Sequence, residues 1–281
     1  MCHVGDIRVC PYYYAYADIQ NNGGSNESIG YKKNARLTIF NITDRWVRLI
    51  TVSSITPMDL PRLASLIERL RASSIGDPEW VSSKHAFEYS AQSVEVVVVL
   101  KLVRATQGVH ALELLCSSGF FVDMGAIYRC VGDCISEVYF LLEKFPEKSS
   151  HVEKFMKEFF SRTIDSHLSS EEEPVQTKKI HSAMIRSLTG REQDERIKGH
   201  LTTIYKTFSG YTHAGYAHIM QMFGGPAQNM SFNISGIPSQ EQKDMHRELV
   251  VEAYKSVLHT VAHTSRTFGL EELHRDVMQY C

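Results

Sequence analysis

Apolar residues recur at helical spacing from about residue 93 almost to the end of the chain, and this pattern constrains the fold more than any other feature. In its clearest segment, residues 120–144, the apolar side chains lie three or four positions apart: Met124, Ile127, Val131, Ile135, Val138 and Leu142. Pro146 follows, as expected where a helix ends, because proline cannot continue the helical hydrogen bonds. Each apolar stripe must be buried against a neighbour, so a succession of stripes predicts a helical bundle.

The same spacing places the other helices. Within residues 91–281 we predict about six helices, over residues 93–118, 120–144, 150–168, 175–188, 192–222 and 240–268. The loop 223–239 is long enough to hold a small hairpin or to carry function. The predicted fold is therefore mainly α, with a multi-helix bundle over residues 91–281.

The N-terminal segment, residues 1–90, has a different character. It is expected to be irregular around "NNGGSNES" at residues 21–28. The stretches "RLTIFNI" and "RWVRLITV", separated by a short turn, are candidate strands of a β-hairpin. One helix is expected at residues 59–73, where leucine and isoleucine recur at helical spacing. The chain is thus predicted to consist of a small N-terminal region followed by the bundle.

Composition excludes several classes of protein. The net charge of -2 gives no overall attraction for nucleic acid. No apolar run is long enough to span a membrane, and the N-terminus lacks the apolar core of a signal peptide, so we expect a cytoplasmic protein without membrane association. The six cysteines form no C-x-x-C pair and are expected to be free thiols in that compartment.

Histidine spacing near the C-terminus raises the question of a metal site. His259 and His263 are four residues apart, and Glu271 and His274 match the Glu-x-x-His motif of di-iron bundles. Such a bundle needs two of these motifs and two further glutamates, and the sequence offers only one motif. The glycines of "FGGPAQN" also lack the lysine of a phosphate-binding loop. We therefore expect no metal and no cofactor.

A set of polar residues on three predicted helices is the candidate functional site. Its members are Glu113, Arg129, Asp133, Tyr205, Ser209 and His213. Arg129 is surrounded in sequence by small residues, and Asp133 follows it by one helical turn. The members on the helix 192–222 are four residues apart and share one face. Glu113, flanked by leucines, is the expected further partner of Arg129, because a buried charge needs more than one.

Two interpretations of this set are open. In one it is a catalytic or binding face, and in the other it is a buried polar network that fixes how the helices register. Buried polar groups must be satisfied whether or not a substrate exists, so the structural interpretation is favoured.

On the predicted helix 192–222, Gly210, Ala214 and Ala217 form a stripe of small residues that would admit a closely packed neighbour. On this helix His218 would point away from His213.

The pattern "ALELLCSSGFFVDMGAIYRCVGDCISEVYFLL", followed downstream by "YKTFSGYTH", resembles an uncharacterised family of bacterial helical proteins. That family has an A-x-E-L-L…G…A…R-x-x-x-(E/D) helical hairpin before a Y-x-x-x-S-x-x-x-H helix, and the six candidate residues stand at the matching positions. The resemblance covers residues 93–222 and implies an all-helical fold without supplying an activity. Some members resemble HEPN-type bundles, many of which are RNases in toxin or antiphage systems.

HEPN nucleases carry an arginine and a histidine four to six residues apart, which support phosphate charge and proton transfer. Two spacings fit in this chain, Arg104 with His110 and Arg162 with His167. Such matches arise by chance in a chain with 13 histidines. The residue after each arginine also departs from the usual pattern, so both pairs rank below the set that contains Arg129 and His213.

The sequence leaves two hypotheses for function, and whether the protein is an enzyme stays open. The first is a helical interaction or regulatory module in a bacterial stress or defence setting, whose partner is another protein or further copies of the chain. The alternative is a HEPN-like, metal-independent RNase in which His213 or His110 transfers a proton and an arginine holds the phosphate. RNA is a partner only under this alternative.

Overall fold

The structure is a computed structural model and describes residues 58–161, 174–190, 195–225 and 228–281. The described chain is mainly helical, with nine helices and two small two-stranded sheets, which confirms the predicted fold class. The candidate hairpin at residues 36–52 and the pair Arg162–His167 lie outside the described residues. None of the described helices is both long and apolar enough to cross a membrane.

An antiparallel pair of long helices forms the centre of the fold, α3 (Val94–Ser118) and α4 (Phe121–Leu142). The Ser93 side chain caps α3 by accepting a hydrogen bond from the Val96 amide. Gly119 ends the helix in the left-handed region, with φ of 78°, and so allows the sharp turn into α4. The two helices approach closely at Gly108, where an added Cβ would overlap the side chain of Val131.

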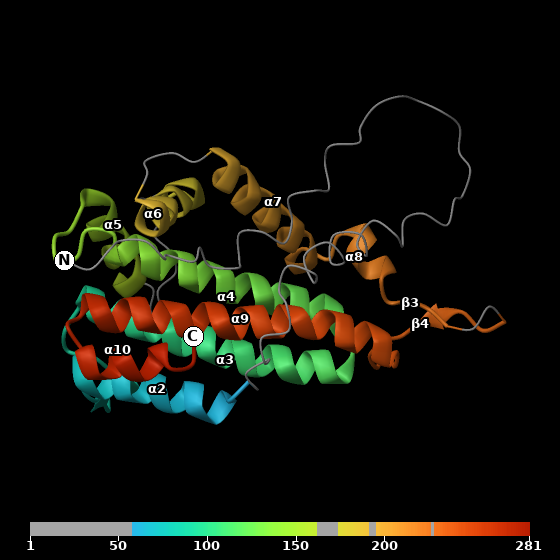
Figure 1. Ribbon diagram of the computed structural model, residues 1–281, viewed down its shortest axis with the longest axis horizontal. Helices are drawn as coiled ribbons and strands as arrows, with labels where there is room; N and C mark the ends of the chain where they lie inside the picture. The colour runs from blue at the N-terminus through green and yellow to red at the C-terminus, as the bar shows by residue number, and fades with distance from the viewer. Residues whose placement is uncertain (1–57, 162–173, 191–194, 226–227) are drawn as a thin grey trace.

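Three more helices cover one side of this pair (Figure 1). They are α9 (Gln240–Thr267), α2 (Leu60–Ser74) and α10 (Glu271–Met278). The helix predicted at 59–73 is confirmed as α2, which buries Leu63, Leu66, Ile67 and Leu70. It packs against α3 and α9, and an ion pair of 2.7 Å from Arg69 to Asp276 joins it to α10. The valines at residues 96–99, near the start of α3, follow one another without polar residues between them and so occupy all sides of the helix. They are buried because α2, α4 and α9 together enclose α3.

The other side of α4 is covered by α6 (Thr177–Thr189) and α7 (Glu195–Thr212), as Figure 1 shows. The short helix α5 (Ser150–Ser161) contacts α3. There the Lys101 ammonium lies 2.5 Å from a carboxylate oxygen of Glu137 and 5.3 Å from the centre of the Phe159 ring. The bundle is therefore layered, with α4 between α3 and α9 on one side and α6 and α7 on the other.

The prediction of one helix over residues 192–222 is wrong. The chain leaves the helix after Thr212 and begins a new short helix, α8 (Tyr216–Met220). Ala214 adopts a positive φ of 50°, which ends α7. The His218 ring folds back onto α7 at Gly210, where an added Cβ would overlap it. The neighbour that needs the small residue at Gly210 is thus a side chain of α8.

Two β-hairpins extend from the helices. The first pairs β1 (Glu79–Val81) with β2 (Ala86–Glu88), between α2 and α3. The second pairs β3 (Phe223–Gly224) with β4 (Ser231–Phe232), within the loop for which the sequence allowed a small hairpin. Each carries one aromatic cross-strand pair, Trp80 with Phe87 in the first and Phe223 with Phe232 in the second.

Packing of α7 on α4 depends on the absence of a side chain at Gly125. An alanine Cβ there would overlap the Cγ atom of Tyr211, which can move away only if Tyr211 leaves its χ1 rotamer or α7 shifts from α4. We expect Gly125→Ala to lower the free energy of unfolding by about 1–2 kcal/mol, since overpacking outweighs the roughly 1 kcal/mol gain in helix propensity. Urea unfolding followed by circular dichroism measures the change.

Gly199 on α7 provides the matched control, because nothing lies within 4 Å of a Cβ added there. Gly199→Ala should raise the free energy of unfolding by up to about 1 kcal/mol through helix propensity alone. Equal effects of the two substitutions would contradict the close approach of Tyr211 to α4.

Candidate functional site

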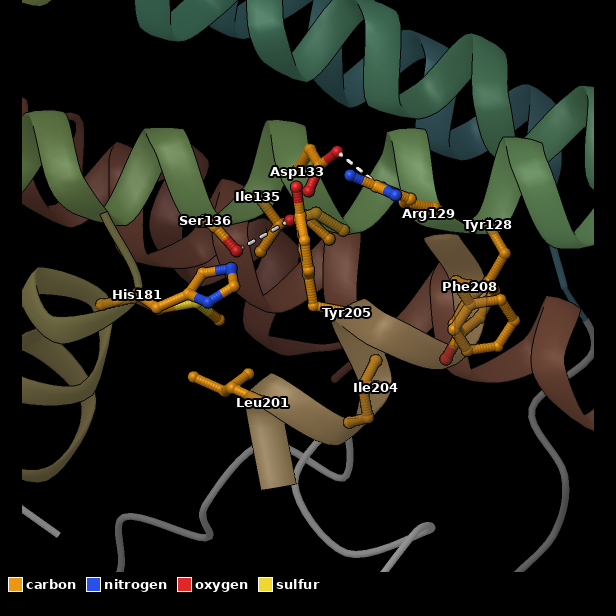
Figure 2. Close-up of a pocket in the computed structure, with 12 residues that line it drawn as sticks. Tyr128, Arg129, Asp133, Ile135, Ser136, His181, Leu201, Ile204, Tyr205 and Phe208 are labelled. Carbon is orange, nitrogen blue, oxygen red and sulfur yellow. Dashed lines mark hydrogen bonds and ion pairs between the residues drawn. The ribbon is translucent and has the colours of Figure 1, made fainter. Parts of the chain in front are cut away.

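A small cavity lies between α4, α6 and α7, where the predicted polar residues of two helices meet (Figure 2). Its volume is about 40 Å³. Figure 2 shows Arg129, Asp133 and Ser136 on α4 facing Tyr205 of α7, with His181 approaching from α6. Apolar side chains such as Leu201 and Phe208 complete the wall. The cavity is therefore a mixed environment in which a few polar groups converge among apolar ones.

Arg129 is the central charged group of this cavity. Its side chain is only 15% exposed, and its guanidinium lies 4.1 Å above the centre of the Tyr205 ring. The Nε atom lies 3.4 Å from a carboxylate oxygen of Asp133, a long contact for an ion pair. Among the described residues the Nη1 atom is buried without a hydrogen-bond partner. The positive charge is thus held in place by the ring and only partly neutralised by the carboxylate.

The carboxylate of Asp133 responds to two opposed effects. Burial raises its pKa, and the charge and hydrogen bond of Arg129 lower it by a smaller amount. Its side chain is still 41% exposed, so solvent screens the pair and its contribution to stability is small. The Asp133 carboxylate therefore helps to orient the Arg129 guanidinium, and the ion pair adds little to the stability of the fold.

His181 is a member of the site that the sequence analysis missed. Its ring meets the ring of Tyr205 edge-on, with the ring centres 5.6 Å apart. Burial lowers the pKa of His181, and the positive charge of Arg129 lowers it further, so the imidazole is neutral at neutral pH. A signal was present in the sequence, because His181 lies beside Ile180 and one turn before Met184 in the apolar part of a predicted helix.

The structure brings together three of the six predicted residues, Arg129, Asp133 and Tyr205. Glu113 is not a partner of Arg129. Its carboxylate instead accepts a hydrogen bond of 2.7 Å from Arg247 of α9. The expectation that Glu113 would pair with Arg129 is therefore wrong.

Ser209 lies one turn after Tyr205 on α7, but neither Ser209 nor His213 lines the cavity. His213 is exposed just beyond the last residue of α7. Arg129 and His213 therefore do not meet at one site, because the cavity lies beside the middle of α7 and His213 follows its end.

Behind the cavity, a partly buried carboxyl group contacts the wall residue Tyr128. The Tyr128 hydroxyl donates a hydrogen bond to Glu252 of α9, and the Tyr128 ring lies tilted by 37° against the Phe208 ring of α7 with ring centres 4.6 Å apart. Burial, assisted by the neighbouring charge of Glu248, raises the pKa of Glu252 to about 7. This carboxyl therefore titrates near neutral pH in the folded protein.

The histidines considered as metal ligands are used in packing. The His263 ring stacks on Tyr139 with ring centres 4.9 Å apart. The Nδ1 atom of His274 lies 2.9 Å from the carbonyl oxygen of Ala262. Within the part of the chain that the structure describes, no three His, Cys, Asp or Glu side chains are grouped so as to hold a metal ion.

A second candidate site is a surface on the hairpin β3–β4 and the adjoining α8. We call residues 216–225 and 228–237 the arm, because their hairpin β3–β4 projects beyond the bundle helices at one end of the molecule (Figure 1). Five large apolar side chains of the arm are exposed: Tyr216, Phe223, Met230, Phe232 and Ile234. The surrounding sequence contains no Asp, Glu, Lys or Arg from residue 207 to residue 240.

The base of the arm is fixed to the corner between α3 and α4. The Ile237 amide donates a 3.0 Å hydrogen bond to the Gly119 carbonyl, and the Ile237 side chain is buried. At Gly236 an added Cβ would overlap the carbonyl oxygen of Ser118. The backbone amide and the side-chain amide of Asn233 both donate to the carbonyl of Met222, which ties the two strands together. The arm is thus held in a defined position relative to the bundle.

The titration of Glu252 predicts how stability depends on pH. Its folded pKa lies above its ordinary value, so the folded state binds the proton more tightly and stability falls as pH rises through about 7. We expect wild-type protein to lose about 2–3 kcal/mol more stability than Glu252→Gln between about pH 5 and about pH 8. Urea unfolding at both pH values measures the difference, and Glu272→Gln on the exposed face of α10 should behave like wild type. Parallel pH profiles for wild type and Glu252→Gln would show that this carboxyl does not titrate as described.

Comparison with known proteins does not assign the chain to a family. No family model, curated protein sequence or solved structure matches it. The resemblance to bacterial HEPN-like proteins therefore stays a prediction, and the cavity and the arm are the features of this chain that bear on its function.

Proposed function

We propose that this protein is a helical interaction module that binds a protein partner through the arm. The observation that carries the proposal is the exposed, uncharged and aromatic surface of the arm. Protein interfaces are depleted in charged residues at their centre and enriched in aromatic residues and methionine. At the chain's charged fraction of 22%, a stretch of 34 residues would hold about seven charged residues, and residues 207–240 hold none.

Exposure makes this composition informative. A buried segment lacks charges because burial is costly for them, but the Tyr216 and Ile234 side chains are 82% and 81% exposed. Groups of exposed apolar side chains on soluble proteins mark interaction sites. Because the base of the arm is fixed by Ile237 and Asn233, a partner would meet a preorganised surface and would pay little conformational entropy to bind it.

The size of the cavity supports a structural role for the polar residues around Arg129. A water molecule needs about 10–15 Å³, so the cavity of about 40 Å³ has room for a few water molecules. Small-molecule pockets are typically about 300 Å³ or larger. The cavity is therefore suited to a hydrated polar network that fixes α6 and α7 on α4, and this ranks the interaction module ahead of an enzyme.

One observation favours the RNase alternative as a second candidate. Arg129 and His181 line the same cavity from different helices, so an arginine and a neutral histidine do lie close together. A neutral imidazole accepts a proton, and an arginine supports phosphate charge. A nucleotide would fit only after α6 or α7 moved away from α4, because of the small volume of the cavity.

A photo-crosslinking amino acid at position 234 tests the interaction module. In cells, we expect it to form covalent adducts with a protein that mass spectrometry identifies. The control is the same amino acid at Phe87, which is 66% exposed on the other hairpin, close to Glu79, Lys84 and Glu88. Absence of a protein adduct at position 234, or equal yields at both positions, would contradict the proposal.

Incubation of the purified protein with mixed RNA in the presence of a chelator tests the alternative. If the RNase hypothesis holds, wild type cleaves RNA, and His181→Ala and Arg129→Lys lose at least tenfold in rate. His213→Ala, which changes an exposed residue away from the cavity, should keep the wild-type rate. Intact RNA with wild-type protein would eliminate the RNase hypothesis.

A further inference from the structure

We propose that the partner of the arm is the arm of a second copy of this chain, in a symmetric dimer. This inference rests on the proposed function, since it names the partner of the same surface. In a twofold interface the same patch is contributed by both subunits, so each residue near the axis faces itself or its close neighbours. The surface must therefore be complementary to itself.

Charge is the first property that fits self-complementarity. A charged side chain near a twofold axis meets its own copy, and like charges that face each other destabilise the complex. The stretch 207–240 avoids this repulsion because it holds no Asp, Glu, Lys or Arg. The net charge of -2 on the whole chain adds little long-range repulsion between two copies.

The unpaired strand edges are the second property. Among the described residues, β3 pairs only with β4, so each strand has one open edge. A two-stranded hairpin with exposed edges gains stability when further strands are added. Edge strands that avoid such pairing carry lysine or other charges, and neither β3 nor β4 carries any. Antiparallel pairing of one edge with its copy is compatible with a twofold axis and would convert two hairpins into one four-stranded sheet.

The aromatic pair is the third property. The Phe223 and Phe232 rings lie 5.1 Å apart on one face of the hairpin, and both remain exposed. Against a second copy these rings would be covered by the same pair, together with Met230 and Ile234. Burial of this apolar area is the main driving force, because each strand is only two residues long and offers few backbone hydrogen bonds.

Other occupants fit the arm less well. An anionic membrane surface attracts lysine and arginine, and the arm has neither. An unrelated protein with a charged docking surface would gain nothing from electrostatic complementarity here. Both remain outcomes that the experiment below separates from self-association.

Sedimentation velocity of the full-length protein over a wide range of concentration tests the proposal. We expect wild type to be dimeric, and Ile234→Asp and Ile234→Lys each to weaken the dimer at least tenfold. Ile234 is 81% exposed, so neither change should disturb the fold, and unchanged thermal unfolding of the monomer verifies this. Phe87→Asp on the hairpin β1–β2, which carries Glu79, Lys84 and Glu88, is the matched control and should leave the dimer intact.

A mixture of the two Ile234 variants gives a signature that only self-association produces. Opposite charges then meet across the interface, so a heterodimer should form at concentrations where each variant alone is monomeric. Wild type that is monomeric at every concentration, or a dimer that is insensitive to Ile234 and to mixing, would overturn the proposal.

The outcomes also separate this inference from the proposed function. Monomeric wild type that still forms adducts with another protein through position 234 overturns self-association alone. Both self-association and the proposed function are overturned if wild type is monomeric and forms no protein adduct, and if it binds phosphatidylcholine vesicles better than the Ile234→Asp variant does.

Discussion

The fold depends on the enclosure of α4 by four other helices. Its partners are α3, α9, α6 and α7, and three of them meet a specific feature of α4. Val131 enters the gap left by Gly108 of α3, and Tyr211 of α7 occupies the gap left by Gly125. Phe121 stacks on His246 of α9 with ring centres 4.0 Å apart. Since interiors are packed at crystal-like density, these contacts fix the relative positions of the surrounding helices.

The polar residues of α4 occupy the side that faces α6 and α7. There the bundle is less tightly filled, and Arg129 is held by Tyr205 and Asp133 beside a small cavity. A buried guanidinium must keep its partners in place, so it restricts how α7 can lie on α4. The neutral imidazole of His181 fits the same environment because it adds no second positive charge. This arrangement gives specificity to the packing of α6 and α7, whose own apolar stripes are less enclosed than those of α3.

The arm has the opposite character, since its apolar residues have no internal partner. Gly119 and Gly236 allow its base to pass very close to the end of α3, and Ile237 anchors it there. The fold therefore presents five exposed apolar side chains on one uncharged arm at a fixed place, whereas the other exposed large apolar side chains of the described residues, such as Phe87 and Leu114, lie on elements that also carry charged residues. An exposed apolar surface favours association with whatever can cover it, and this is the physical basis of the proposal that the arm binds a partner.

The sequence by itself determined the helices and their buried faces. The stripes in α2 and α4 depend on local spacing and were sufficient to place those helices. It also identified Arg129, Asp133 and Tyr205, because an arginine among small residues and a polar face on α7 are visible in one dimension. Only the tertiary structure decided that α7 ends before His213, that Glu113 pairs with Arg247, and that His181 joins the cavity. These outcomes depend on which helices become neighbours, and periodicity tells which face of a helix is buried but not which residue of another helix it meets.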